Sequence, residues 1–469
     1  MSRLIAVSNR VADSSNGKTA GGLAVGLLAA LRKQGGVWFG WGGRTCHGEP
    51  TDPTVIRRGK VSYATIDIDE VEFENYYNGY SNGCLWPLCH YMLNFFHYER
   101  CFGRAYVRVN ALFARKLRPL LQVDDVIWAH DYHLIPLAGE LRKAEVENPI
   151  GFFLHVPFPN IDVLRTLPGH RLILEMLTRY DVIGFQTTSD VRSFIEGLSR
   201  VGFLESRLGH DRFRACGREF TAAAFPIGID VPGVIQMSER AVGSATVKRM
   251  RDGLVSRDLI TGVDRLDYSK GLPERFRAFE ELLASYPDTR GRLVFMQIAP
   301  PTRGGVRAYQ DIRAELERLS GNINGRFAEP DWVPIRYLNR GFSRSILMGI
   351  FRAARIGLVT PLRDGMNLVA KEFVAAQDPD DPGALILSSL AGAAEELDAA
   401  VIVNPYDIEG VAEAIQRAAN MRLAERQERH RSMMGQLRLN DIGAWTDRFL
   451  GALEAVRQQE CRGGSITDA

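Results

Sequence analysis

The segment TPLRDGMNLVAKE, residues 360–372, decides how the second half of the chain is organised. The apolar run IGLV at residues 356–359 stands directly before it and predicts a buried strand, and a helix is predicted to begin near Asn367. Gly365 lies in the turn between them and has no Cβ to obstruct a ligand. The first amides of such a helix lack intrahelical acceptors and carry the positive end of the helix dipole. The segment therefore predicts a phosphate-binding turn.

The residues of this turn supply the candidate ligand contacts. The backbone amides expected to face an anion are those of Met366, Asn367, Leu368 and Val369. Glu372 is expected to accept hydrogen bonds from sugar hydroxyls, because a carboxylate offers several lone pairs. The alternative is that Asp364 or Asn367 only caps an ordinary helix, and the segment alone does not choose between the two.

Composition and charge narrow the class of protein. A chain of 469 residues exceeds what one hydrophobic core usually serves, so two domains with a cleft between them are expected. The apolar content of 45% is ordinary for a soluble protein, and a formal charge of +2 argues against a nucleic-acid or membrane partner. The six cysteines show no metal-type spacing and predict reduced thiols. Without a membrane-length apolar run or a signal-peptide core, a cytoplasmic location is expected.

The first half of the chain opens with a second strand, loop and glycine-led helix. Residues 3–8 predict a strand that leads to Arg10, and residues 20–27 open a helix whose glycines at 21, 22 and 26 permit close approach of a sugar or phosphate. These glycines do not form the GxGxxG pattern, so a nicotinamide site is not expected. Arg10 would face the crevice at the carboxyl end of the sheet; the alternative is a surface ion pair.

Two aromatic and glycine-rich stretches are predicted to be loops, WFGWGG at 38–43 and YYNGYSNGCLWP at 76–87. Aromatic rings pack against the C–H groups of sugars, while hydroxyl, amide and indole groups meet the sugar hydroxyls. The same residue types also fill ordinary cores, and some of these residues are expected to do so.

Polar residues follow two more predicted strands of the first half. HDYH at 130–133 follows the strand predicted over 123–129, and His155 follows the one predicted over 150–154. The HDYH residues lack a third well-spaced metal ligand, so structural histidines are favoured over a metal centre. The DxD tripeptide at 67–69, found in metal-dependent sugar transferases, is a weak match because no long buried strand is predicted before it.

The second half repeats the alternation of strands and helices. Its predicted strands cover residues 259–263, 293–298, 333–337, 356–359, 384–387 and 400–403. The fold class is therefore α/β with two Rossmann-like domains. The predicted division is residues 1–232, residues 233–440, a helix over 441–457 with an apolar stripe, and a polar tail over 458–469.

Two cations follow the first strand of the second half. Arg265 and Lys270 could both reach phosphates held by the turn at residues 360–372 if the two strands are neighbours. Two fixed cations neutralise the charge that grows on a departing nucleoside diphosphate, as a magnesium ion does elsewhere. Arg303, in another loop after a strand, suits a second anion.

The ordered set of motifs resembles the trehalose-6-phosphate synthase family, retaining glycosyltransferases of the GT-B type, over residues 1 to about 450. The motifs are SNR at 8–10, GGLAVG at 21–26, HDYH at 130–133, HVP at 155–157, GVDRLDYSKG at 262–271 and RDGMNLVAKE at 363–372. The resemblance implies transfer of glucose from a nucleotide donor, usually UDP-glucose, to glucose 6-phosphate. It also implies no metal or other cofactor, a last helix that crosses back to the first domain, and a homodimer or homotetramer.

The resemblance also implies roles for individual residues. On the acceptor side, the phosphate contacts would be Arg10, Tyr77 and Arg303, and the sugar-ring contacts Trp86 and Asp131. On the donor side, the diphosphate contacts would be Arg265, Lys270, Gly22 and the amides of Leu368 and Val369, with Glu372 on the ribose. The transferred glucose would be oriented by His155, Asp364 and the adjoining amides of Gly365, Met366 and Asn367.

Some features leave alternatives open. The loop between Arg10 and Gly21 differs from that of relatives, and Gly79-Tyr80 and Gly83-Cys84 vary the aromatic stretch. Glucosylglycerol-phosphate synthases and pseudo-glycosyltransferases share the donor half, so the donor is predicted more securely than the acceptor. A catalytically silent sugar-phosphate sensor of the same fold is a further alternative, against which the intact Arg265, Lys270 and Glu372 argue.

Overall fold

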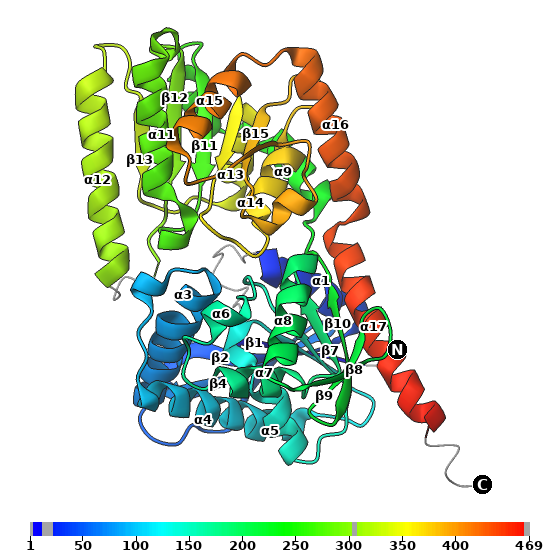
Figure 1. Cartoon of the computed structure of the whole chain (residues 1–469). Coiled ribbons are helices and arrows are strands. Elements are labelled where there is room, and N and C mark those ends of the chain that lie inside the picture. The colour runs from blue at the N-terminus through cyan, green and yellow to red at the C-terminus, as the bar shows by residue number, and fades with distance from the viewer. Residues whose placement is uncertain (1–2, 12–21, 303–306, 464–469) are drawn as a thin grey trace. The chain divides into compact units, whose positions relative to one another are not determined.

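The computed structural model divides the chain into two compact units (Figure 1). It describes residues 3–11, 22–302 and 307–463. Unit 1 combines Met1–Ile227 with Ile442–Ala469, and unit 2 is Gly228–Asp441. The predicted boundary at residue 232 falls inside helix α9, Val231–Val242, because Pro232 lies in the first turn of this helix instead of before it. Its cap is Asp230, whose Oδ1 accepts a hydrogen bond from the Gly233 amide at 3.0 Å.

Unit 1 is built on one large sheet. Its described residues contribute ten strands in the order β3-β4-β2-β1-β5-β6-β7-β10-β9-β8, in which neighbours from β4 to β10 pair in parallel. The strands are β1 (Leu4–Arg10), β2 (Gly36–Cys46), β3 (Thr54–Arg58), β4 (Val61–Asp69), β5 (Val126–His130), β6 (Ile150–Phe153), β7 (Val182–Phe185), β8 (Leu204–Arg207), β9 (Arg212–Ala215) and β10 (Arg218–Ala224). The strands β5, β6 and β7 are buried along their whole length, as expected for the centre of a parallel sheet.

Both aromatic and glycine-rich stretches differ from the predicted loops. The first lies in β2, where Trp38, Phe39 and Trp41 are buried. A Cβ on Gly40 would lie 2.1 Å from the Ser8 carbonyl oxygen, so the glycine serves close strand pairing rather than a loop. The second stretch forms the π-helix η2, Glu74–Leu85, between the short helices α2, Glu70–Phe73, and α3, Trp86–Cys89. π-Helices are rare and often mark functional segments.

The last helix, α17, Ile442–Gly463, packs on the sheet of unit 1. Trp445, Phe449 and Leu453 are fully buried. A Cβ on Gly151 of β6 or Gly184 of β7 would lie 2.7 Å from the Phe449 ring, so both glycines make room for it. The helix continues to Gly463 and includes residues predicted as polar tail, because Gln458, Glu460 and their neighbours are good helix formers.

Unit 2 contains a fully parallel sheet. Its described residues form six strands in the order β13-β12-β11-β14-β15-β16. The strands are β11 (Asp258–Val263), β12 (Leu293–Ile298), β13 (Ile335–Leu338), β14 (Ile356–Val359), β15 (Ala384–Ser388) and β16 (Val401–Val403). Counted along the chain this is the order 3-2-1-4-5-6 of a Rossmann fold, so the predicted α/β class is confirmed.

Two groups of helices cover this sheet. One group consists of α11 (Leu272–Ser285), α12 (Arg307–Phe327) and α15 (Ile408–Ala419). The other consists of α9, α10 (Ala245–Asp252), α13 (Arg344–Ala353), α14 (Leu368–Ala376) and α16 (Leu423–Leu439). Across the described residues of both units, none of the helices combines the length and apolar character needed to cross a bilayer.

Candidate active site

The strand order of unit 2 brings the two predicted donor loops together. The order reverses between β11 and β14, which pair directly, and open α/β sheets bind ligands beyond such a switch point. The loop after β11 carries Arg265, which is exposed, and Lys270, which is buried. The Lys270 Nζ lies 2.5 Å from the Asp364 Oδ2 in the loop after β14. The two cations are expected to reach the turn at 360–372 only if their strand lies next to the strand that leads to this turn. The pairing of β11 with β14 meets that condition.

The turn that holds Lys270 is fixed by its own polar groups. The Asp267 carboxylate accepts hydrogen bonds from the Ser269 amide at 3.0 Å and the Ser269 hydroxyl at 2.9 Å. Gly271 has φ 64°, and a Cβ there would lie 2.5 Å from the Thr360 carbonyl oxygen. Only a glycine therefore lets the loop after β11 lie against the strand end of β14.

The start of α14 has the geometry of an anion-binding helix end. Asn367 caps the helix through its Oδ1, which accepts from the Ala370 amide at 3.2 Å, and its Nδ2 donates to Asp364 at 3.0 Å. The first-turn amides of Leu368 and Val369 have no intrahelical acceptor. Asn367 adopts φ 79°, a backbone strain that proteins retain mainly at functional positions. Asn367 therefore caps the helix, and the first-turn amides of Leu368 and Val369 stay available for the anion that the other reading predicts. Phosphate binding at this helix start stays a prediction.

Glu372 is held by a partner that the sequence did not indicate. The Arg344 Nη2 of α13 donates to the Glu372 Oε1 at 2.8 Å. Burial raises the pKa of Glu372, and the charge and hydrogen bond of Arg344 oppose that shift. The pair fixes the carboxylate on the second turn of α14, close to the helix start that is predicted to bind phosphate.

Unit 1 has its own switch point, between β1 and β5. Asp131 follows β5 with φ 76° and ψ 163°, a conformation that is nearly confined to glycine. Its amide donates to the Phe153 carbonyl at 2.8 Å, and its Oδ1 accepts from the His155 amide at 3.3 Å. The structure thus joins two of the predicted site residues at adjacent strand ends.

His155 is packed against a second histidine. The His130 Nδ1 lies 3.2 Å from the His155 Nε2. Burial lowers the pKa of His155 to about 3 and, together with His155, lowers the pKa of His130 well below its ordinary value. Trp445 of α17 lies beside both rings, with centroids 6.2 and 6.4 Å away. Both imidazoles are therefore neutral at neutral pH and suited to hydrogen bonding with a sugar hydroxyl.

Aromatic rings lie beside three of the remaining predicted acceptor contacts, Arg10, Tyr77 and Trp86. The Arg10 guanidinium lies 5.4 Å from the Trp41 ring centroid, and the Trp41 and Tyr77 centroids are 6.2 Å apart. Tyr77 of η2 stacks on His133 at 5.7 Å. Trp86 is buried in α3, with its ring 5.9 Å from that of Tyr132.

Two predicted residues have limited structural description. Arg303 lies outside the described residues. Gly22 is the first residue of α1, Gly22–Gln34. The other predicted residues divide between the units: the candidate acceptor contacts and His155 lie in unit 1, and the loop and helix residues for the donor lie in unit 2.

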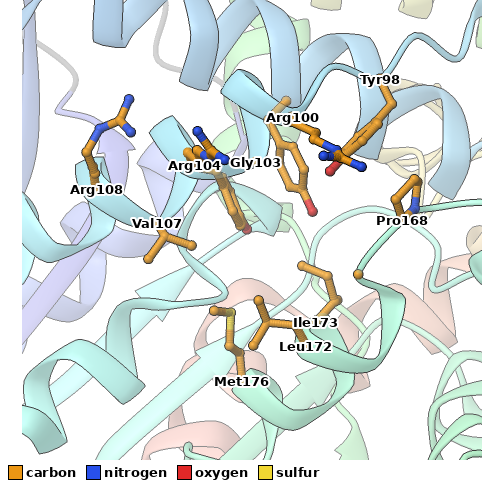
Figure 2. Close-up of a pocket in the computed structure, with 13 residues that line it drawn as sticks. Tyr98, Arg100, Gly103, Arg104, Val107, Arg108, Pro168, Leu172, Ile173 and Met176 are labelled. Atoms are coloured by element: carbon orange, nitrogen blue, oxygen red, sulfur yellow. The ribbon is translucent and has the colours of Figure 1, made fainter.

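A hollow of about 610 Å³ in unit 1 contains none of the predicted site residues. It lies between α4, Arg100–Leu117, and α7, His170–Leu177. Figure 2 shows Arg100 and Arg104 on one side of it and Leu172 and Met176 on the other. This hollow is therefore separate from the candidate site, which is marked by strained backbone and convergent polar groups.

Comparison with known proteins adds independent information. The model of glycosyltransferase family 20 matches residues 4–455. A trehalose-6-phosphate synthase of Klebsiella pneumoniae subsp. pneumoniae is 49% identical over 466 residues, which cover 98% of each chain. A UDP-forming α,α-trehalose-phosphate synthase from Burkholderia xenovorans, solved in complex with glucose-6-phosphate, is 52% identical, with a TM-score of 0.93 and coverage of 96% of this chain and 100% of that chain. A structure described as trehalose-6-phosphate from E. coli bound with UDP-2-fluoro glucose is 47% identical, with a TM-score of 0.92 and coverage of 96% and 99%.

Proposed function

Because the chain belongs to glycosyltransferase family 20, we propose that it transfers glucose from UDP-glucose to glucose 6-phosphate, forming α,α-trehalose 6-phosphate and UDP. The similar proteins carry this activity in their names and are matched over nearly their whole length. That agreement favours the synthase over the glucosylglycerol-phosphate, pseudo-glycosyltransferase and sensor alternatives.

The observation that carries the proposal is the ion pair between Lys270 and Asp364, in the loop that leads into α14 at the switch point of unit 2. In the proposed complex, Lys270 and Arg265 hold the diphosphate, and the amides of Leu368 and Val369 meet its oxygens. Glu372, fixed by Arg344, accepts from the ribose hydroxyls.

In the proposal, the transferred glucose is held by His155 and by Asp364. His155 is neutral and acts as a hydrogen-bond partner, while Asp364 accepts from sugar hydroxyls beside the Lys270 ammonium. The amides next to Gly365 complete this contact, and Gly22 lets the donor phosphate approach. On the acceptor, Arg10, Tyr77 and Arg303 bind the phosphate, and the contacts to its ring come from Trp86 and Asp131.

Charge stabilisation is the main catalytic term in this proposal. Breaking the glycosidic bond places negative charge on the leaving diphosphate and positive charge on the sugar ring. Two cations, of which Lys270 is held by Asp364, and a helix end oriented before the reaction stabilise that leaving group. We propose that a leaving-phosphate oxygen accepts the proton of the acceptor hydroxyl on the same face of the sugar, so retention requires no carboxylate nucleophile. The chain's own cations are proposed to make a metal ion unnecessary.

One incubation tests the proposal. Purified protein is supplied with UDP-glucose and either glucose 6-phosphate or glycerol 3-phosphate, and the product is identified by mass spectrometry and NMR. We expect a disaccharide phosphate with α,α linkage from glucose 6-phosphate only, at equal rates with and without EDTA. A glycerol product would contradict the proposed acceptor, and the absence of any transfer would contradict the proposed activity. Activity that requires added magnesium would contradict the proposal that no metal is needed.

The predicted assembly and location stay predictions. We propose a homodimer or homotetramer in the cytoplasm, with small-molecule substrates and no nucleic-acid or membrane partner. Light scattering of the purified protein measures its oligomeric state, and a monomeric mass would reject the proposed homodimer or homotetramer. Cell fractionation measures its location.

A further inference from the structure

An arginine that the sequence patterns did not single out lies beneath the proposed diphosphate site. Arg275 belongs to α11, and its side chain has no exposed surface. A buried arginine is unfavourable unless all its hydrogen-bonding capacity is matched, and apolar side chains often stabilise a fold equally well. Its presence at this position therefore calls for a role beyond stability.

The Arg275 guanidinium joins three strand ends of unit 2. Its Nη1 donates to the Asp264 Oδ2 after β11 at 2.8 Å and to the Gln297 Oε1 of β12 at 2.9 Å. Its Nε donates to the Thr360 Oγ1 after β14 at 3.1 Å, and its Nη2 donates to the Lys270 carbonyl at 3.3 Å. The loops joined in this way are those that carry Lys270 and Asp364.

The backbone around the guanidinium is shaped to admit it. A Cβ on Gly262 of β11 would lie 2.6 Å from the Arg275 Nη1 and 2.4 Å from the Gln297 Oε1. A planar group with five donors in a fixed arrangement can hold several acceptors at set distances, which a lysine ammonium cannot do.

The charges matter as well as the positions. Asp264 is a buried carboxylate next to Arg265 in the loop proposed to bind a diphosphate. Without a cation against it, its negative charge would repel the ligand in a low-dielectric surrounding. The Arg275 ion pair offsets that charge and leaves Lys270 to act on the phosphates.

We propose that Arg275 is a positioning residue for donor binding: it holds the Lys270 loop against the end of β14 and neutralises Asp264. This inference rests on the proposed use of a nucleoside diphosphate sugar. It assigns no contact with the substrate to Arg275.

The first test compares Arg275→Met with Arg275→Lys and a matched control. The control is Arg426→Met, which removes another buried arginine of unit 2, paired with Asp381 at 2.6 Å. UDP binding is measured by titration calorimetry, the KM of each substrate by UDP release, and folding by thermal denaturation. We expect Arg275→Met to weaken UDP binding at least tenfold with an acceptor KM within twofold of wild type. The UDP affinity of Arg275→Lys should lie between those of Arg275→Met and wild type. Arg426→Met should have a lower melting temperature than wild type but the same UDP affinity.

Two further variants separate position from charge. Gly262→Ala keeps every charge but displaces the guanidinium, so we expect at least fivefold weaker UDP binding. Adding Asp264→Asn to Arg275→Met removes the unpaired carboxylate and should restore part, not all, of the binding. If Arg275→Met does not fold, Gly262→Ala and Arg275→Lys decide the result.

The outcomes distinguish this inference from the proposed function. Folded Arg275 variants and Gly262→Ala that bind UDP within twofold of wild type would overturn the positioning role alone. Equal losses of UDP affinity in Arg426→Met would also overturn it, because the effect would then follow from stability. A wild-type chain that neither binds UDP nor transfers glucose would overturn the proposed function and this inference with it.

Discussion

Replacing Lys270 by methionine separates two effects of its ion pair with Asp364, the stability of the fold and the stabilisation of the leaving diphosphate. Methionine keeps the aliphatic length and removes the charge. The Lys270 and Asp364 side chains are 11% and 15% exposed, and their charged atoms are 2.5 Å apart. Removing one partner of a buried pair costs about 3–5 kcal/mol, and we expect the lower end because the Asn367 Nδ2 still donates to Asp364 at 3.0 Å. Loss of one preoriented donor to a developing anion lowers kcat by roughly 10²–10³-fold.

A second buried lysine provides the control for this variant. Lys371 of α14 has a fully buried side chain, and its Nζ lies 2.5 Å from the Glu396 Oε2. Lys371→Met should therefore reduce the free energy of unfolding in urea at least as much as Lys270→Met. Its kcat, measured by UDP release at saturating substrates, should stay within about tenfold of wild type. Equal kcat losses in the two variants, or a Lys270→Met enzyme that turns over like wild type, would refute the assigned role.

Three other perturbations follow from the same contacts. Phe449→Ala should lower the free energy of unfolding by about 3–5 kcal/mol in urea titrations, because the buried ring stacks on Trp128 with centroids 4.6 Å apart; a loss below 1 kcal/mol would contradict its place in the core. Between pH 3 and 6.5 the unfolded chain binds a proton at His155 that the folded chain does not, so the free energy of unfolding should rise with pH in this range. His155→Gln should reduce the slope of the free energy of unfolding against pH by roughly 1 kcal/mol per pH unit. An unchanged slope would disprove the lowered pKa of His155. Arg344→Gln should raise the KM for UDP-glucose about tenfold by freeing Glu372, with the acceptor KM unchanged, and an effect on the acceptor alone would reject the ribose contact.

Local sequence patterns were sufficient to predict several strands of unit 2 and the turn before α14. The apolar runs around residues 259–263 and 356–359 lie in paired strands, and Gly365 stands in the turn before α14, because these features depend on neighbours in the sequence. The same approach was wrong for Trp38 and Trp41, since glycines beside aromatic residues suit a loop and a closely paired strand alike. The pairs made by Arg275 and Arg344 could not be predicted, because arginine is common on helix surfaces and its partner is chosen by tertiary packing.

The chain enters unit 2 at Gly228 and leaves it at Asp441, and these two points lie next to each other. A Cβ on Gly228 would lie 2.1 Å from the Asn440 carbonyl oxygen and 2.3 Å from the Asp441 carbonyl carbon, so the chain segments that enter and leave unit 2 are in contact. An inserted domain whose ends adjoin can be removed and replaced by a short linker, whereas deleting residues after Asp441 would strip Trp445 and Phe449 from unit 1. During synthesis, unit 2 leaves the ribosome complete before unit 1 has received its final helix. Premature termination after Asp441 should therefore damage the half of the protein that is made first, not the half that is made last.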